Sequence, residues 1–218
     1  MSSQNRHLDM HPFWGYASPL YSLWAVGFLV FSSSSLAYGI IAFLDILGVF
    51  LASSVGILSF LYLFNIKERA AWQILMILVP AFVQYVFLLA LSFISPILYL
   101  ETFFFLLIVP FLFLSSGIPM LDFSFPQRVV GQSIIKALIV GLLGLALSCI
   151  REPFGHGSLT IPTRYGAVNF LSSEQSASIA IQLLASTAGL LILFGYVVAL
   201  YRFFRRVYRH YLEQKEGE

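Results

Sequence analysis

Long apolar runs separated by short polar stretches dominate this chain of 218 residues. A helix needs about 20 mostly apolar residues to cross the hydrocarbon core of a bilayer. Six segments approach or exceed that length, although the first one is short because its apolar part ends at residue 31, before a run of serines. The segments cover residues 19–35, 36–64, 71–94, 103–120, 129–150 and 177–201. We therefore expect an all-α transmembrane protein, a six-helix bundle in one integral membrane domain over residues 1–218 that includes a cytoplasmic basic tail over residues 202–218.

The composition excludes several other classes of protein. Hydrophobic residues make up 59% of the chain and charged residues 10%, whereas a soluble domain carries about 25% charged residues, so a lipid bilayer must cover much of the surface. The net charge of +2 and the lack of a basic run interleaved with aromatic residues exclude a nucleic-acid partner. The single cysteine, Cys149, excludes an intrachain disulfide framework. The sequence has no phosphate loop, dinucleotide fingerprint, zinc-ligand spacing or nucleophile elbow, so we expect no catalysis by this chain alone.

Basic residues predict the orientation, because Lys and Arg are retained on the cytoplasmic side of a membrane. With six spans, most of them share the side of the C-terminal tail. These are Arg6, Lys67, Arg69, Arg128, Arg202, Arg205, Arg206, Arg209 and Lys215. Only Arg151 and Arg164 lie on the opposite side. We therefore expect a multi-pass protein of the inner (cytoplasmic) membrane with both termini in the cytoplasm.

Two short segments, 83 residues apart, resemble each other. Residues 26–34 read VGFLVFSSS and residues 109–117 read VPFLFLSSG. Each is an apolar half-span that ends in small polar residues, and each contains a residue that weakens a helix, Gly27 or Pro110. Three spans separate them, so they would enter the membrane from opposite sides. The pattern indicates an inverted repeat of two three-helix halves with broken first helices, although Phe, Leu and Ser are abundant enough for chance similarity.

Two charged residues lie inside apolar runs. Asp45 is in the middle of the second run, where an unpaired carboxylate costs roughly 3 kcal/mol or more. It is a candidate for an ion or proton route, or else a structural acid that is hydrogen-bonded to a neighbouring helix. Lys136 lies inside the fifth run, as a second candidate for the ion route. It would pair with Asp45 or, as we favour, extend its ammonium to the interface.

The most distinctive segment is Arg-Glu-Pro-Phe-Gly-His-Gly-Ser-Leu at residues 151–159. Pro153 is expected to stop the fifth helix, while Gly155 and Gly157 free the backbone beyond it. Arg151 and Glu152 form a charge pair at the helix exit, and a helix-terminating turn fixed by charge is the simplest interpretation. His156 has no His or Cys partner at ligand spacing, and Cys149 is expected to be a small buried hydrophobe.

The fifth helix with its Arg151–Glu152 motif resembles the small membrane subunits of the Rnf and Nqr electron transport complexes. Those subunits carry an Arg-Glu-x-x-Gly-x-Gly-Thr-like motif at the same place, and they share the six spans and the inverted repeat. They occur as two sisters of opposite orientation, and the inferred cytoplasmic C-terminus is similar to that of one sister only. The resemblance implies a subunit of a redox-driven, ion-translocating complex. Its partners would be other membrane subunits, including a sister subunit of opposite topology.

The resemblance also implies a [2Fe–2S] cluster that two sister subunits share, each supplying one cysteine per broken helix. The corresponding positions here are Gly27 and Ser116. Glycine has no side chain and serine is a poor iron ligand, so this chain is a divergent member. We expect it to bind no cluster, and we assign it no other cofactor or metal.

A second class of function fits the same topology. The substrate-binding membrane component of a vitamin importer needs a polar pocket near the outer face. The loop over residues 155–175 would supply its lid, with Thr160, Arg164, Tyr165 and Asn169 as polar groups. A membrane scaffold protein is a further possibility.

Overall fold

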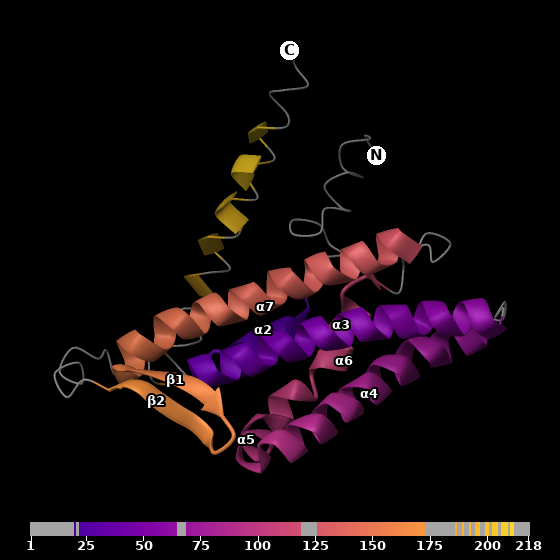
Figure 1. Cartoon of the computed structure of the whole chain (residues 1–218). Coiled ribbons are helices and arrows are strands. Elements are labelled where there is room, and N and C mark those ends of the chain that lie inside the picture. Colours follow the sequence, from indigo (N-terminus) through magenta and orange to yellow (C-terminus); the bar gives the residue numbers. More distant parts are fainter. Residues whose placement is uncertain are drawn as a thin grey trace.

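The structure, a computed structural model, is a bundle of helices with a small β-hairpin at one end (Figure 1). It describes residues 20, 22–64, 69–118 and 126–172, together with scattered positions between 186 and 211. The elements are α2 (Leu23–Ser32), α3 (Leu36–Phe64), α4 (Arg69–Ile94), α5 (Pro96–Leu106), α6 (Val109–Ser115), α7 (Pro126–His156), β1 (Ser158–Thr163) and β2 (Gly166–Ser172). This arrangement is an all-α transmembrane bundle, as the sequence predicted.

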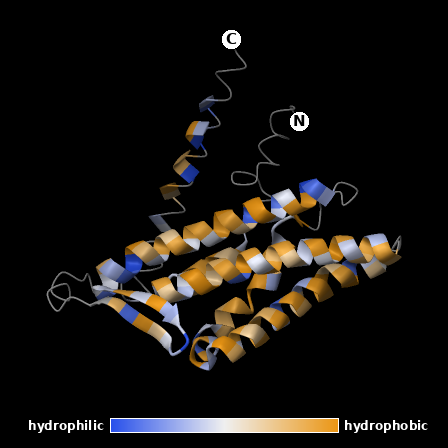
Figure 2. Cartoon of the chain, viewed as in Figure 1, coloured by the Kyte–Doolittle hydropathy of each residue, from blue (hydrophilic) through white to orange (hydrophobic). Residues whose placement is uncertain are grey.

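Four helical stretches of the described chain are long and apolar enough to cross a membrane. They are Leu36–Phe64, Ala71–Ile94, Pro96–Ser115 and Pro126–His156. Hydrophobic residues predominate along them, and hydrophilic turns lie at the two ends of α7 (Figure 2). The chain is therefore a multi-pass membrane protein. The first predicted span contains the ten-residue α2, whereas the sixth, over residues 177–201, and the tail after it lie outside the described residues apart from scattered positions.

Helices α3 and α7 pack against each other and run antiparallel, and α3 lies between α7 and α4 (Figure 1). Small residues allow a close approach between them. A Cβ added to Gly141 would collide with the ring of Phe43 and a methyl group of Ile46. The hydroxyls of Ser54 and Ser133 are hydrogen-bonded. The antiparallel packing places the starts of α4 and α7 at one end of the bundle and the Arg151 motif at the other (Figure 1). Which end faces the cytoplasm stays a prediction.

The structure corrects the predicted end of the fifth span. Helix α7 continues through Pro153 to His156. A proline inside a helix removes one backbone hydrogen bond, but the next turn still closes, since the Gly157 N–H donates to the Pro153 carbonyl over 3.0 Å. The helix ends at Gly157, whose φ of 65° is a left-handed conformation that glycine adopts without strain.

The breaks in the short helices also differ from those predicted. Gly27 lies inside the uninterrupted α2, and the chain bends after it, between Ser32 and Leu36. In the second half, the interruption lies at Leu107 and Ile108, between α5 and α6. The fourth span accordingly begins at Pro96, a favourable first residue for a helix, and not at residue 103. The inverted repeat itself stays a prediction.

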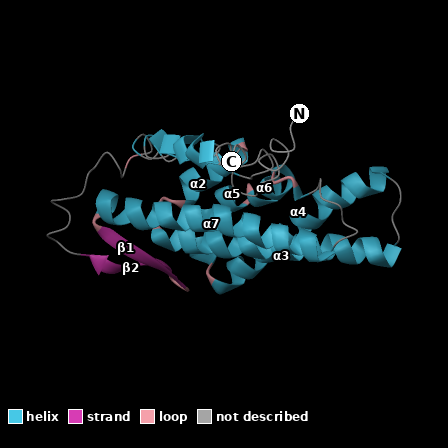
Figure 3. Ribbon diagram, turned by 90° about the horizontal axis from the view of Figure 1, so that it is seen from above, coloured by secondary structure: helices cyan, strands magenta, loops and turns pink. Residues whose placement is uncertain are grey.

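Residues 158–172 form an antiparallel hairpin that the sequence analysis treated as a loop. Strands β1 and β2 pair from Ser158 opposite Ser172 to Thr163 opposite Gly166, with an irregularity after Leu159. Gly166 adopts a φ of 110° at the tight turn. The hairpin lies along the C-terminal part of α7 (Figure 3) and also contacts the start of α3.

Candidate functional site

Glu152 joins the end of α7 to the start of α3. Its side chain is buried, with 1% of its surface exposed, and its Oε2 accepts a hydrogen bond from the backbone N–H of Leu36 over 2.5 Å. The first N–H groups of a helix lack intrahelical partners and carry partial positive charge, so a carboxylate stabilises them. The Arg151–Glu152 motif is therefore a helix cap supplied by another part of the chain.

Two further side chains complete this cap. Ala37 donates its N–H to the hydroxyl of Thr160 on β1 over 3.3 Å, and Tyr38 donates its N–H to the hydroxyl of Ser35 over 3.2 Å. Arg151 and Gly155 are buried beside Glu152 on the last turns of α7. The hairpin thus binds the start of α3 through Thr160, whereas Arg164, Tyr165 and Asn169 are exposed on it.

Lys136 of α7 binds the C-terminal end of α6. Its side chain is 3% exposed, and its ammonium donates a hydrogen bond to the backbone carbonyl of Ser116, the residue that caps the C-terminus of α6. The last carbonyls of a helix carry partial negative charge, so a cation is favourable there. The predicted pairing of Lys136 with Asp45 is therefore wrong, since Asp45 bonds to Gln84 instead. Extension of the ammonium to the membrane interface stays a prediction.

Asp45 lies inside the bundle with none of its surface exposed. Its Oδ2 accepts a hydrogen bond from Nε2 of Gln84 on α4 over 3.2 Å. Oδ1 of Asp45 and Oε1 of Gln84 are buried without a hydrogen-bond partner among the described residues. Buried polar atoms are nearly always paired, so these two oxygens are open to a proton, a cation or a water molecule. The geometry fits both interpretations of Asp45, a structural acid and a station on an ion route.

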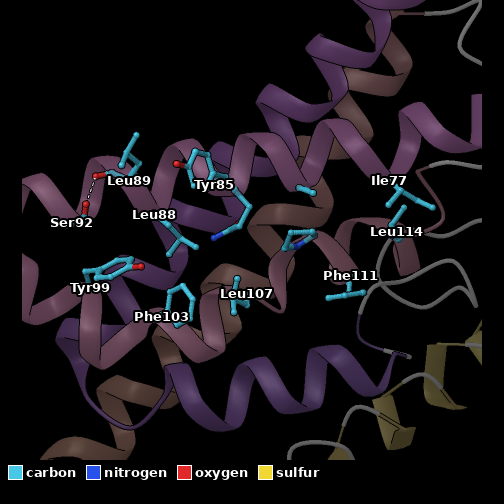
Figure 4. Close-up of a pocket in the computed structure, with 13 residues that line it drawn as sticks. Ile77, Tyr85, Leu88, Leu89, Ser92, Tyr99, Phe103, Leu107, Phe111 and Leu114 are labelled. Carbon is cyan, nitrogen blue, oxygen red and sulfur yellow. Dashed lines mark hydrogen bonds between the residues drawn. The ribbon is translucent and has the colours of Figure 1, made fainter.

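Gln84 also lines a groove on the outside of the bundle. The groove has a volume of about 530 Å³ and lies between α4 on one side and α5 and α6 on the other. Figure 4 shows Tyr85 and Leu88 facing Tyr99, Phe103 and Leu107 across it. Gln84 was not among the predicted site residues, although a lone amide in the middle of a predicted span was a signal for it.

The positions that correspond to cluster ligands in the Rnf and Nqr subunits do not come together. A Cβ on Gly27 would lie 3.7 Å from Cδ1 of Ile108, at the start of α6. The hydroxyl of Ser116, at the end of α6, donates to the Phe113 carbonyl over 2.6 Å. Cys149 is exposed on α7, which corrects the expectation that it is buried. Gly27 and Ser116 do not fit an iron–sulfur cluster, because neither residue has a thiol.

The two segments that resemble each other in sequence lie side by side. Trp24 of α2 stacks on Phe111 of α6, with ring centroids 4.7 Å apart and an interplanar angle of 20°. Phe28 of α2 meets the edge of Phe105 on α5, at 6.3 Å between centroids. The contact places α2 against the interruption between α5 and α6.

Comparison with known proteins gives no relative: no protein-family model matches the sequence, and no curated protein and no solved structure matches it significantly. The fold and the site define a multi-pass membrane protein in which the start of α3 and the end of α6 lie on buried charged side chains of α7.

Proposed function

We propose that this protein is a membrane subunit of a redox-driven, ion-translocating electron transport complex of the Rnf/Nqr type. In this role it holds the interrupted helices at the junction between subunits and supplies no cluster ligand. It would lie in the inner membrane with both termini in the cytoplasm, beside a sister subunit of opposite topology.

The observation that carries the proposal is the bond from Leu36 to Glu152. It gives the most distinctive motif of the sequence a structural role, since Glu152 binds the N-terminus of α3 that the bend between α2 and α3 exposes; the interrupted helix pair α5 and α6 lies beside α2 and α3. Interrupted helices inside a membrane are tolerated where they are buried in protein or line a cavity, and they mark ion and substrate sites in transporters.

Two more features support an ion-translocating role. The first is the contact of α2 with α6, the two half-spans of the proposed inverted repeat, through Trp24 and Phe111. The second is Asp45, a fully buried acid in a predicted span whose Oδ1 has no partner among the described residues. Ionisable residues inside membranes face bundle interiors and mark ion pathways. Asp45 is accordingly the residue that we assign to the ion route.

Co-purification tests the assignment. The full-length protein, carrying an affinity tag, is solubilised in mild detergent from its native membranes, and its partners are identified by mass spectrometry. We expect a second small six-span subunit and partners that contain flavin, detected by absorbance, and iron–sulfur clusters. A protein that purifies alone, or that binds a small vitamin tightly, would contradict the proposal and favour a substrate-binding component.

Iron analysis tests the cluster separately. The pair formed with the sister subunit is purified, and its iron content is measured per mole of this chain. We expect less than one iron per pair, since Gly27 and Ser116 supply no thiolate. Two irons per pair would show that this chain does contribute to a cluster.

A further inference from the structure

The carbonyl end of α6 lies inside the bundle and ends on a positive charge. The C-cap residue of this helix is Ser116, and its carbonyl accepts a hydrogen bond from the ammonium of Lys136. Ile118 donates its N–H to the Ser116 hydroxyl, so the chain turns directly after the helix end. The remaining lone pairs of such an end face a low-dielectric interior, where a cation stabilises them strongly.

Buried hydroxyl groups lie on the stretches of α7 and α3 near Lys136. Ser133 lies one turn before Lys136 on α7, and its hydroxyl is 2.5 Å from that of Ser54 on α3. The neighbouring Ser53 is fully buried, and its hydroxyl has no hydrogen-bond partner among the described residues. Phe50, one turn earlier on α3, packs edge-on against Phe113 of α6 at 5.4 Å, which places this stripe of α3 against α6.

The only carboxylate of α3 does not belong to this group. Asp45 is about two turns from Ser53 along the helix, and its hydrogen bond goes to Gln84 on α4. Within the part of the chain that the structure describes, the ammonium of Lys136 therefore bonds to a helix end and not to a carboxylate. Carbonyl and hydroxyl oxygens without a carboxylate suit a single positive charge, whereas Mg²⁺ and Ca²⁺ are usually bound with carboxylates.

We propose that the carbonyl end of α6 is a binding site for a monovalent cation, and that Lys136 fills it with a tethered ammonium. C-terminal ends of interrupted helices coordinate Na⁺ in several transporter folds, and a lysine ammonium carries the same charge. The wild-type protein then needs no dissolved cation at this place. Removal of the ammonium opens the site to Na⁺ or K⁺. The inference does not depend on the redox assignment, because it concerns a site within this chain.

The experiment compares thermal unfolding of the full-length wild type and of Lys136→Ala in detergent. Each is measured in NaCl, KCl and N-methylglucamine chloride at equal ionic strength. We expect the wild-type Tm to be the same in all three salts. The variant should gain about 5 °C in Na⁺ or K⁺ relative to the bulky cation, and the gain should saturate with concentration, as for binding to one site.

Two matched variants separate this effect from general salt effects. Lys136→Arg keeps a tethered cation and should behave as the wild type does. Arg128→Ala removes an exposed charge from the first turn of the same helix, and it should show no preference among the three salts. Methylammonium chloride, which carries the lost group as a free ion, should raise the Tm of Lys136→Ala as well.

Three outcomes would overturn the proposal. Lys136→Ala could fold and give the same Tm in all salts, or the wild type could respond to Na⁺ or K⁺ as strongly as the variant does. In the third outcome, the variant fails to fold in every cation, methylammonium included, which would mean that no free cation can replace the side chain.

Discussion

Glu152 of α7 accepts a hydrogen bond from the backbone N–H of Leu36, 116 residues earlier in the chain. Sixteen residues before Glu152 on the same helix, or about 24 Å along its axis, Lys136 donates to the carbonyl of Ser116. Helix α7 thus carries two buried charges of opposite sign. Each lies on a helix end of the opposite partial charge, the anion on the N-terminus of α3 and the cation on the C-terminus of α6.

Glu152→Ala should destabilise the bundle by about 1–3 kcal/mol, because it leaves the part-buried Leu36 N–H without an acceptor. Glu152→Gln keeps an acceptor oxygen and should cost less. Thermal or denaturant unfolding in detergent measures the difference. Glu101→Gln is the control: Glu101 is exposed and accepts from the Tyr38 hydroxyl, and its substitution should stay within about 0.5 kcal/mol. An alanine variant as stable as the wild type would contradict the capping role.

Gly141→Ala should loosen the contact of α3 with α7. The added methyl would lie 2.6 Å from Cδ2 of Phe43 and 3.2 Å from Cγ2 of Ile46, and overpacking of this kind costs about 1–3 kcal/mol. On the same helix, Gly131→Ala meets nothing within 4 Å and should gain up to about 1 kcal/mol from helix propensity. The two variants are compared by unfolding in the same detergent. Equal stabilities would mean that the helices are not closely packed at Gly141.

Asp45→Asn should abolish ion translocation by the assembled complex while the fold is retained. Asparagine keeps an oxygen that accepts from Gln84, but it cannot carry a negative charge through the cycle. Ion uptake into proteoliposomes that contain the purified complex measures the effect. Asp45→Glu, which retains the carboxylate, is expected to preserve part of the activity. Uptake at the wild-type rate by the asparagine variant would identify Asp45 as a structural acid.

Trp24 and Phe111 should show energetic coupling in a double-mutant cycle with alanine. Stacked aromatic pairs contribute about 0.5–1.5 kcal/mol beyond the area that they bury, and these rings lie 4.7 Å apart. The four proteins of the cycle are compared by unfolding in detergent. Pairing Trp24→Ala with alanine at Phe104, an exposed residue of α5, provides a cycle in which the coupling should be close to zero. Zero coupling for Trp24 and Phe111 would argue against a fixed contact between α2 and α6.

Much of the membrane architecture follows from local sequence. The length and apolarity of residues 36–64 and 71–94 predicted α3 and α4 closely, because a span is defined by a continuous stretch of chain and the thickness of the bilayer. Ends were harder to predict. Pro153 was expected to stop α7, but one lost hydrogen bond is tolerated when the next turn closes on Gly157 and Glu152 is buried against α3. The hairpin after it was missed, since its strands are short and β1 contains a proline.

The sequence by itself determined that the chain is a multi-pass helical membrane protein and that Asp45 and Lys136 lie in apolar runs, where a charge is costly; it placed Glu152 only as a charge at a helix exit. Only the tertiary structure decided which partners these three charges have. Gln84, the Ser116 carbonyl and the Leu36 N–H lie 39, 20 and 116 residues away from the groups that they meet. Two of the three are backbone groups that every residue possesses. A backbone group becomes a partner for a buried charge only where a helix ends, and the packing of α3, α6 and α7 sets those ends beside the charges.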